Sequence, residues 1–326
     1  MDILQILSNT AAQILEPVTL GFVLAAIGLS VHFGFAGLLN MGVAGFMAIG
    51  AYGFAISIDT FSAPWPLAVL VGLVAAVLFA LVMGIPTLRL RGDYLAIVTI
   101  AAAEVLRLLF LTSTWRSVTG SSDGLTRFQS GFRASNPLPE GRYGLGPWTY
   151  TSNQWWVILV GLVVIAVVVL LVWLAMRSPW GRVIRGIRED EDAVRSLGKN
   201  VFAYKMQALI LGGVIIALGG ILTAMGTNIN PNVYVTSQTF YIWTALLLGG
   251  AATIFGPVLG AVLFWVVRAF LSNLLPALVK IGWLPFLTSE QSQMLVFVLV
   301  GIALVLLVIF RPQGILGSKK ELTFVR

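Results

Sequence analysis

Long apolar stretches alternate with short polar ones along the chain, at the spacing typical of membrane-spanning helices. A helix needs about 20 apolar residues to cross about 30 Å of hydrocarbon. The first two such stretches are separated by almost nothing polar, so the boundary between them is poorly defined. The predicted spans are residues 18–38, 40–58, 65–86, 93–113, 155–176, 206–227 and 294–310.

Two further segments do not fit a single upright span. Residues 239–272 are too long for one crossing, and a cluster of glycine and proline at 249–257 interrupts them, which predicts two crossings or a broken helix pair. Residues 3–15 are short and contain polar amides, which predicts an interfacial helix or half a span. We therefore expect an all-α, polytopic transmembrane helical bundle of about eight to ten spans, forming one domain over residues 1–326.

Composition excludes a soluble globular protein. Hydrophobic residues make up 58% of the 326 residues and charged residues 10%, against about 45–50% and about 25% in soluble domains. The chain has no cysteine and one histidine, His32, which excludes thiolate chemistry, disulfides and histidine clusters. It contains no G-x-x-x-x-G-K-[ST], H-E-x-x-H or G-x-S-x-G pattern. We expect no enzyme and no cofactor or metal bound by this chain.

The distribution of basic residues predicts the orientation in the membrane. Twenty Lys and Arg residues against 13 Asp and Glu residues give a net charge of +7, which here indicates cytoplasmic loops rather than nucleic-acid binding. Basic residues concentrate in 87–92, 177–205 and 311–326, whereas 228–238 has none. This pattern makes 177–205 a cytoplasmic loop, 311–326 a cytoplasmic tail and 114–154 an extracytoplasmic loop. Nine spans would put the N-terminus outside, and ten would put it inside.

A glycine-rich segment, Gly34 to Gly53, has six glycines at membrane depth. Small residues allow close helix packing or a break in a helix, and a break at that depth survives only where protein or a water-filled cavity surrounds it. Asn40 lies within this segment. Its side chain either faces such a cavity or makes a hydrogen bond across tightly packed helices.

A pair of opposite charges lies inside the predicted span 93–113. Glu104 is roughly 16 Å along the helix from Asp93, which places it near the bilayer midplane, where a lone charge costs about 2.5–3.5 kcal/mol. Arg107 follows at i+3 and shares its helix face. The pair is either a structural intramembrane ion pair or part of a polar translocation path. The candidate path residues are Asn40, Thr99, Glu104 and Arg107.

The predicted cytoplasmic loop contains a short helix signal. Ser178-Pro179 ends the preceding span. The acidic run Glu189 to Asp192 suits the first turn of a helix, and Gly198 suits its C′ position. Such an element is either a docking helix for a soluble partner or an ordinary solvated loop.

Seven stretches of the chain match the pattern of one known protein family, in the order in which that family has them. The stretches are GLLNMGVAGFMAIGAY at 37–52, TLRLRGDYLAIVTIAAAEVLR at 87–107, TGSSDGL at 119–125, GRVIRGIREDEDAVRSLGKN at 181–200, GGILTAMGTNINP at 219–231, GGAATIFGPVLGA at 249–261 and RPQGILG at 311–317. On these residues the chain resembles the LivM-type permease subunits of bacterial branched-chain amino acid ABC importers. It departs from them within TGSSDGL, where the family more often has Gly-Gly and Asn, and at 251–253, where the family has a further glycine.

The resemblance implies one membrane-embedded half of an importer in the bacterial cytoplasmic membrane. The implied partners are two cytoplasmic ABC ATPase subunits that hold ATP and Mg, a second LivH-like permease, an extracytoplasmic solute-binding protein and membrane lipid, with no nucleic acid. ATP binding would drive alternating access, with the solute delivered by the binding protein to segments 114–154 and 228–238. The resemblance also implies a coupling helix that docks on an ATPase. Its residues are Arg188, Glu189, Asp190, Glu191, Asp192, Ala193, Val194, Arg195, Ser196, Leu197 and Gly198.

Two other classes of transporter remain as alternatives. An ABC permease for urea, short amides or a sugar would share every feature above. A gradient-driven secondary transporter would work alone, but the single acid–base pair at membrane depth supplies few groups for coupling to a gradient.

Overall fold

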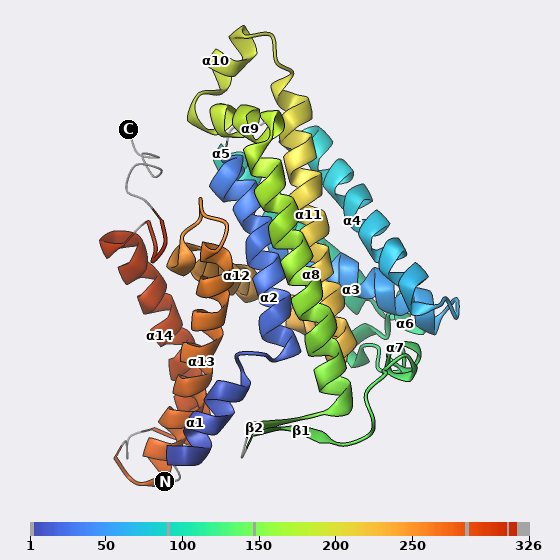
Figure 1. Ribbon diagram of the computed structural model, residues 1–326, viewed down its shortest axis with the longest axis vertical. Helices are drawn as coiled ribbons and strands as arrows, with labels where there is room; N and C mark the ends of the chain where they lie inside the picture. The colour runs from blue at the N-terminus through green and yellow to red at the C-terminus, as the bar shows by residue number, and fades with distance from the viewer. Residues whose placement is uncertain (1–2, 90–91, 146–147, 284–286, 312, 318–326) are drawn as a thin grey trace.

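The computed structural model describes residues 3–89, 92–145, 148–283, 287–311 and 313–317. The chain is a bundle of long helices with short elements at its two ends (Figure 1). Among the described residues, seven helices are long and apolar enough to cross a membrane, and α3 is slightly shorter. The longer elements are α1 (Ile3–Ala12), α2 (Pro17–Leu29), the π-helix η1 (Ser30–Phe35), α3 (Val43–Asp59), α4 (Trp65–Thr87), α5 (Gly92–Leu111), α8 (Ser152–Arg177), α9 (Pro179–Glu189), α10 (Glu191–Ser196), α11 (Val201–Gly226), α12 (Thr236–Gly249), α13 (Gly256–Lys280) and α14 (Ser289–Phe310).

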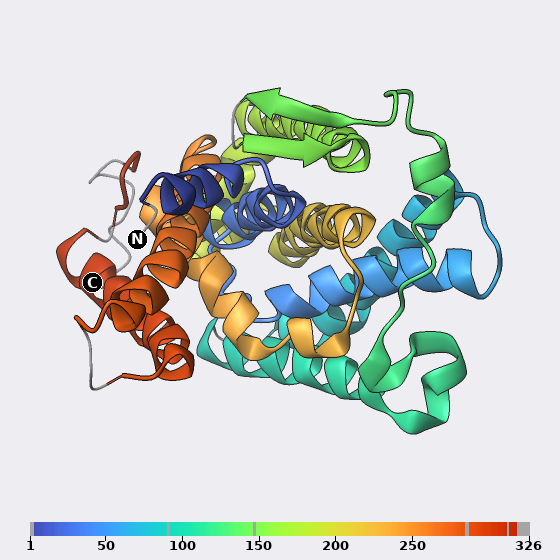
Figure 2. The same cartoon turned by 90° about the horizontal axis from the view of Figure 1, so that it is seen from below.

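Helices α2 and α11 form the centre of the bundle, as Figure 2 shows from one end. Of the most apolar stretch of Pro17–Phe35, 89% is buried inside the chain, compared with 11% for Glu290–Leu307 in α14. The outer helices α4, α5, α8, α13 and α14 therefore expose wide apolar faces. In a membrane protein such faces contact lipid or another membrane subunit.

Glycines bring the two central helices into direct backbone contact. A Cβ at Gly219 of α11 would lie 2.4 Å from the carbonyl oxygen of Gly21 in α2. A Cβ at Gly28 of α2 would lie 2.5 Å from the carbonyl oxygen of Gly212 in α11. This line of close backbone contact is called the α2–α11 seam below. Close approach of this kind is how small residues pack helices in a membrane, where no hydrophobic effect drives helices together.

The chain breaks its helical path twice within the bundle. After α2 it continues as the wider η1 and then as the irregular segment 36–42, so α3 begins only at Val43. The second break separates α12 from α13 at residues 250–255, where Gly250 has a φ of +116°. The backbone N–H groups of Ile315 and Leu316 donate to the carbonyl oxygens of Leu248 and Gly249. The segment after α14 thereby completes the end of α12.

The end of the bundle that carries α1 also carries most of the connection 112–151. This connection contains η2 (Ser113–Trp115), α6 (Arg116–Thr119), η3 (Ser121–Asp123), α7 (Ser130–Ala134) and the hairpin of β1 (Arg142–Leu145) with β2 (Trp148–Thr151). Leu125 pairs with Ile229, which lies just before η4 (Pro231–Val233). The Gln129 amide donates to the carbonyl oxygens of Ala224 and Thr227 at the end of α11. The two connections therefore form one ordered surface.

The predicted helical bundle is confirmed, and most helix boundaries lie within a few residues of the apolar stretches. The predicted break at 249–257 is also confirmed. Three features differ from expectation. The first span ends as a π-helix, the second begins later than residue 40, and residues 142–145 pair with 148–151 as two antiparallel strands.

We expect Gly219→Ala to destabilise the protein by about 1–3 kcal/mol, because its methyl group would collide with the backbone of α2. The measurement is thermal unfolding of the detergent-solubilised protein. Gly301→Ala in α14 is the matched control, since no atom lies within 4 Å of its added Cβ. An unchanged melting temperature for Gly219→Ala would contradict the close α2–α11 contact.

Candidate functional site

Two short helices, α9 and α10, project from the end of the bundle opposite to α1 (Figure 1). Ser178 ends α8, and its hydroxyl also accepts from Gly181 N–H to start α9. Asp190 starts α10, because its carboxylate accepts from Ala193 N–H at 3.0 Å. Gly198 follows α10 with a φ of +76°, the left-handed conformation favoured after a helix. The short helix that the acidic run predicted is confirmed, while α9 was missed.

Ion pairs hold α10 in place. Arg195 donates to Glu191 at 2.9 Å and to Asp192 at 2.8 Å, within the helix. Lys205 of α11 also contacts Glu191. Beneath the helix, Val194 packs with Ile187 and Val201 in a small apolar cluster. The Lys205–Glu191 contact and the apolar cluster thus join α10 to α11 and α9, whereas the Arg195 pairs lie within α10.

The outer face of α10 is exposed and mixed in character. Leu197 is 78% exposed at the end of the helix, beside charged side chains. A single exposed apolar side chain is common on protein surfaces, so Leu197 marks the accessible face of α10 and does not by itself identify a contact. By contrast, Arg188 and Val194 turn toward the bundle. The predicted coupling segment 188–198 therefore has an inner and an outer face.

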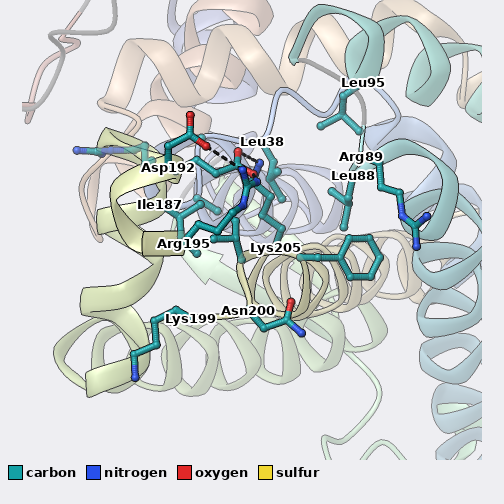
Figure 3. Close-up of a pocket in the computed structure, with 16 residues that line it drawn as sticks. Leu38, Leu88, Arg89, Leu95, Ile187, Asp192, Arg195, Lys199, Asn200 and Lys205 are labelled. Carbon is teal, nitrogen blue, oxygen red and sulfur yellow. Dashed lines mark hydrogen bonds and ion pairs between the residues drawn. The ribbon is translucent and has the colours of Figure 1, made fainter. Parts of the chain in front are cut away.

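A cavity of about 920 Å³ opens between α10 and the turn after α4 (Figure 3). Its lining includes Arg89, whose guanidinium lies 5.6 Å from the centre of the Phe202 ring. Leu38 of the irregular segment and Leu95 of α5 lie at its inner wall. The cavity thus extends from the α9–α10 unit to the first break of the bundle.

A buried hydrogen-bond network fills that break. The Asn40 amide nitrogen lies 3.0 Å from His32 Nδ1, and His32 Nε2 lies 3.0 Å from the carbonyl oxygen of Leu209 in α11. Because a carbonyl only accepts, Nε2 carries the proton and Nδ1 accepts from Asn40. Asn40 Oδ1 accepts from Gly42 N–H at 2.7 Å. Trp243 Nε1 of α12 donates to the carbonyl oxygen of Asn40.

Thr99 of α5 belongs to the same network. Its hydroxyl accepts from Met41 N–H at 2.9 Å and donates to the carbonyl oxygen of Ala96 at 3.0 Å. Thr99 and Asn40 are both fully buried. Of the two interpretations of Asn40, the structure shows the hydrogen bond within packed helices.

Glu104 and Arg107 lie further along α5. Arg107 Nη2 is 2.5 Å from Glu104 Oε1, and Arg107 Nη1 is 3.4 Å from Asn232 Oδ1 in the connection before α12. The side chain of Glu104 is 38% exposed on the outer surface of the bundle. The contact with Asn232 places Arg107 beside the connection between α11 and α12. The pair and the Asn40–Thr99 network are therefore separate sites.

Comparison with known proteins gives the family. Residues 18–310 match the family model described as branched-chain amino acid transport system / permease component. The chain belongs to this family. The permease is 32% identical over 315 residues to the high-affinity branched-chain amino acid transport system permease protein LivM of Salmonella typhimurium, covering 91% of this chain and 68% of that protein.

Relatives of lower identity include both branched-chain amino acid and nucleoside permeases. It is 24% identical to the probable branched-chain amino acid transport permease protein LivM of Methanocaldococcus jannaschii, over 93% of this chain and 92% of that protein. It is 25% identical to the nucleoside ABC transporter permease protein NupC of Lactococcus lactis, over 70% of this chain and 71% of that protein.

Two members of the buried hydrogen-bond network, His32 and Trp243, were not among the residues predicted from the sequence of the permease. His32 was treated only as an isolated histidine, and Trp243 was part of an apolar stretch. The sequence did contain a signal for His32, because it is a polar side chain at membrane depth, eight residues before Asn40. The two side chains can form a hydrogen bond if the chain turns back between them. No comparable signal marked Trp243.

We expect Asn40→Leu to lower the stability of the permease by about 1–3 kcal/mol, because it leaves His32 Nδ1 and Gly42 N–H buried without a partner. His32→Phe should also destabilise. The double variant should be less destabilised than the sum of the two, with a coupling of about 0.5–3 kcal/mol. The measurement is chemical unfolding in detergent, and additive effects would contradict the hydrogen bond.

Proposed function

We propose that this chain is the transmembrane permease subunit of an ABC importer that moves branched-chain amino acids into the cytoplasm by alternating access. The observation that carries the proposal is the family match over residues 18–310, supported by relatives named as permease proteins of branched-chain amino acid transport. The named nucleoside permeases are more distant. ATP and Mg are held by partner subunits in this proposal.

The α9–α10 end faces the cytoplasm in this proposal. Helices α9 and α10 and the adjoining ends of α4, α8 and α11 carry many basic residues, and cytoplasmic segments have an excess of such residues. They are Arg89, Arg177, Arg182, Arg185, Arg188, Arg195, Lys199 and Lys205. Helix α14 then runs toward the cytoplasm, with the C-terminus on that side, and α1 lies outside. This topology corresponds to the nine-span alternative.

The α9–α10 unit docks on one of two ATPase subunits. It is held to the bundle by ion pairs and apolar packing, so force applied to its exposed face reaches the spans without being absorbed by a flexible loop. The exposed Leu197 and the surrounding charges supply an apolar anchor with a polar rim, the usual anatomy of a protein interface.

A second permease, LivH-like, covers the exposed face of α5. Only 17% of the apolar stretch of α5 is buried within the chain, yet the helix carries the partly exposed Glu104–Arg107 pair. A charged pair facing lipid is costly, whereas the same pair facing a water-filled path or a protein partner is not. Glu104 and Arg107 therefore line the translocation path between the two permeases, and Asn40 with Thr99 supports the inner wall.

The joined connections 112–151 and 227–235 receive the solute-binding protein. They lie at the opposite end from α9–α10 and are tied together by the Leu125–Ile229 pair and by the Asn230 amide, which donates to the carbonyl oxygen of Ser122. Burial raises the pKa of Tyr234 in the second connection, so its phenol stays uncharged. Among the described residues, the first connection carries Arg116, Arg127, Arg133 and Arg142 against Asp123 and Glu140. An ordered, net basic platform of this kind suits transient docking.

The decisive experiment is ATP-dependent uptake by the purified importer in liposomes, with this chain, the second permease, the ATPases and the binding protein present. We expect radiolabelled leucine, isoleucine or valine to accumulate only with ATP inside and binding protein outside. If ATP drives uptake of urea, a sugar or a nucleoside but not of branched-chain amino acids, the proposed substrate class is wrong. Uptake by this chain alone, driven by a gradient, would overturn the importer proposal.

We expect Leu197→Asp to weaken retention of the ATPase subunits at least about tenfold, because it replaces the apolar anchor of the interface by a charge, a loss of about 1.4 kcal/mol or more. The measurement is the amount of ATPase that copurifies with the tagged permease at increasing dilution. Val233→Asp, an exposed apolar residue at the other end, is the control. Equal retention by both variants would exclude Leu197 from the interface.

A further inference from the structure

The side chain of Arg188 points away from the proposed ATPase surface and into the bundle. It is only 6% exposed, although it lies at the end of α9. Its Nη1 donates to the carbonyl oxygen of Gly34 at 2.6 Å. Its Nε donates to Glu189 at 3.0 Å, which orients the guanidinium. The aliphatic part of the side chain packs on Gly37, where an added Cβ would lie 3.1 Å from Arg188 Cγ.

Gly34 lies in the last turn of η1, where backbone carbonyl groups lack helical partners and attract a cation. A hydrogen bond from an ionised donor to such a carbonyl is stronger than one between neutral groups. Gly34 is buried, so replacing Arg188 would leave the Gly34 carbonyl oxygen without its charged donor. The contact therefore holds α9 to η1 firmly.

The far side of η1 abuts the second break of the bundle. A Cβ at Gly34 would lie 1.7 Å from the carbonyl oxygen of Ala251, so the two backbones are in direct contact. Ser30, one turn earlier in η1, donates to the same carbonyl oxygen at 2.5 Å. Movement of η1 is thus passed directly to the connection between α12 and α13.

The middle of η1 connects to the first break. His32 accepts from Asn40, whose carbonyl oxygen accepts from Trp243 of α12. The π-helix η1 therefore contacts α9, and other residues of η1 contact both breaks of the bundle. Single-turn π-helices of this type occur frequently at functional sites.

We propose that Arg188 is a positioning residue that transmits movement of the docked α9–α10 unit to η1, and through η1 to both broken segments of the permease. This inference rests on the proposed function, because it assigns the internal route for the movement that the ATPases impose. Arg188 contributes to coupling and makes no contact with the ATPase. Without the Arg188 side chain, we expect the complex to stay assembled and to hydrolyse ATP without moving solute.

The first test compares Arg188→Gln with Arg311→Gln, an exposed arginine directly after α14 and outside the α9–α10 unit. Both variants are purified as complete importers in liposomes. We expect Arg188→Gln to retain the ATPases and basal ATP hydrolysis. Leucine uptake, and the stimulation of hydrolysis by loaded binding protein, should fall at least tenfold. Arg311→Gln should stay within twofold of the unmodified importer.

The second test replaces the contact by a covalent bond. A Cβ at Gly37 would lie 3.6 Å from Arg188 Cβ, a separation that suits a disulfide, and the chain has no other cysteine. We expect the pair Gly37→Cys with Arg188→Cys to be uncoupled when reduced and to recover at least half of the uptake when oxidised. Each single cysteine variant controls for loss of the arginine or strain at Gly37, and gel mobility after proteolysis between the two positions measures cross-linking.

The outcomes separate this inference from the proposed function. If the unmodified importer shows no ATP-dependent uptake, the proposed function fails and the inference fails with it. If the unmodified importer transports but Arg188→Gln transports equally well, only the inference is overturned. Loss of the ATPases from Arg188→Gln would assign the residue to docking instead. Failure to cross-link, or complete cross-linking without recovery, would contradict a rigid link between α9 and η1.

Discussion

The requirement that every backbone polar group at membrane depth find a partner within the protein governs the centre of this permease. In lipid no water is present to replace a missing helical hydrogen bond. The chain leaves the helical path at η1 and does not resume it until Val43. Hydroxyl groups from other helices accept the hydrogen bonds that backbone carbonyl oxygens would accept in a continuous helix. Thr99 accepts from Met41, and Thr239 of α12 accepts from Ala44 at 3.1 Å. The break therefore exists only in the assembled bundle, and it ties α5 and α12 to the start of α3.

The close α2–α11 seam makes that arrangement possible. Backbone contact at glycines keeps these helices rigid and leaves the outer helices to provide the surfaces for other subunits. Stability is concentrated along the central axis, whereas the α5 face, the α9–α10 unit and the outer connections lie at the periphery. Such a division allows the periphery to rearrange during a transport cycle while the centre stays folded.

Much of the fold was predictable because hydropathy reports directly on the lipid environment. The spans, the interrupted pair at 249–257 and the capping of α10 by Asp190 and Gly198 all follow from local chemistry. The π-helix, the late start of α3 and the His32–Asn40 bond were not predictable, because they depend on which helices become neighbours. Helix α9 was missed since Ser178 both ends one helix and starts the next. The roles of the candidate path and coupling residues stay predictions. The structure divides them into a buried network, a separate charged pair and an exposed end unit.

The segment after α14 also bears on how the permease is made. Ile315 and Leu316 supply the donors that complete the end of α12, although α12 leaves the ribosome long before they do. Until residues 313–317 emerge, the carbonyl groups of Leu248 and Gly249 lack these partners at the edge of the bundle. Arrival of this segment is therefore the step at which the broken α12–α13 pair reaches its final form. A chain stopped short of it would lack these two hydrogen bonds at the end of α12.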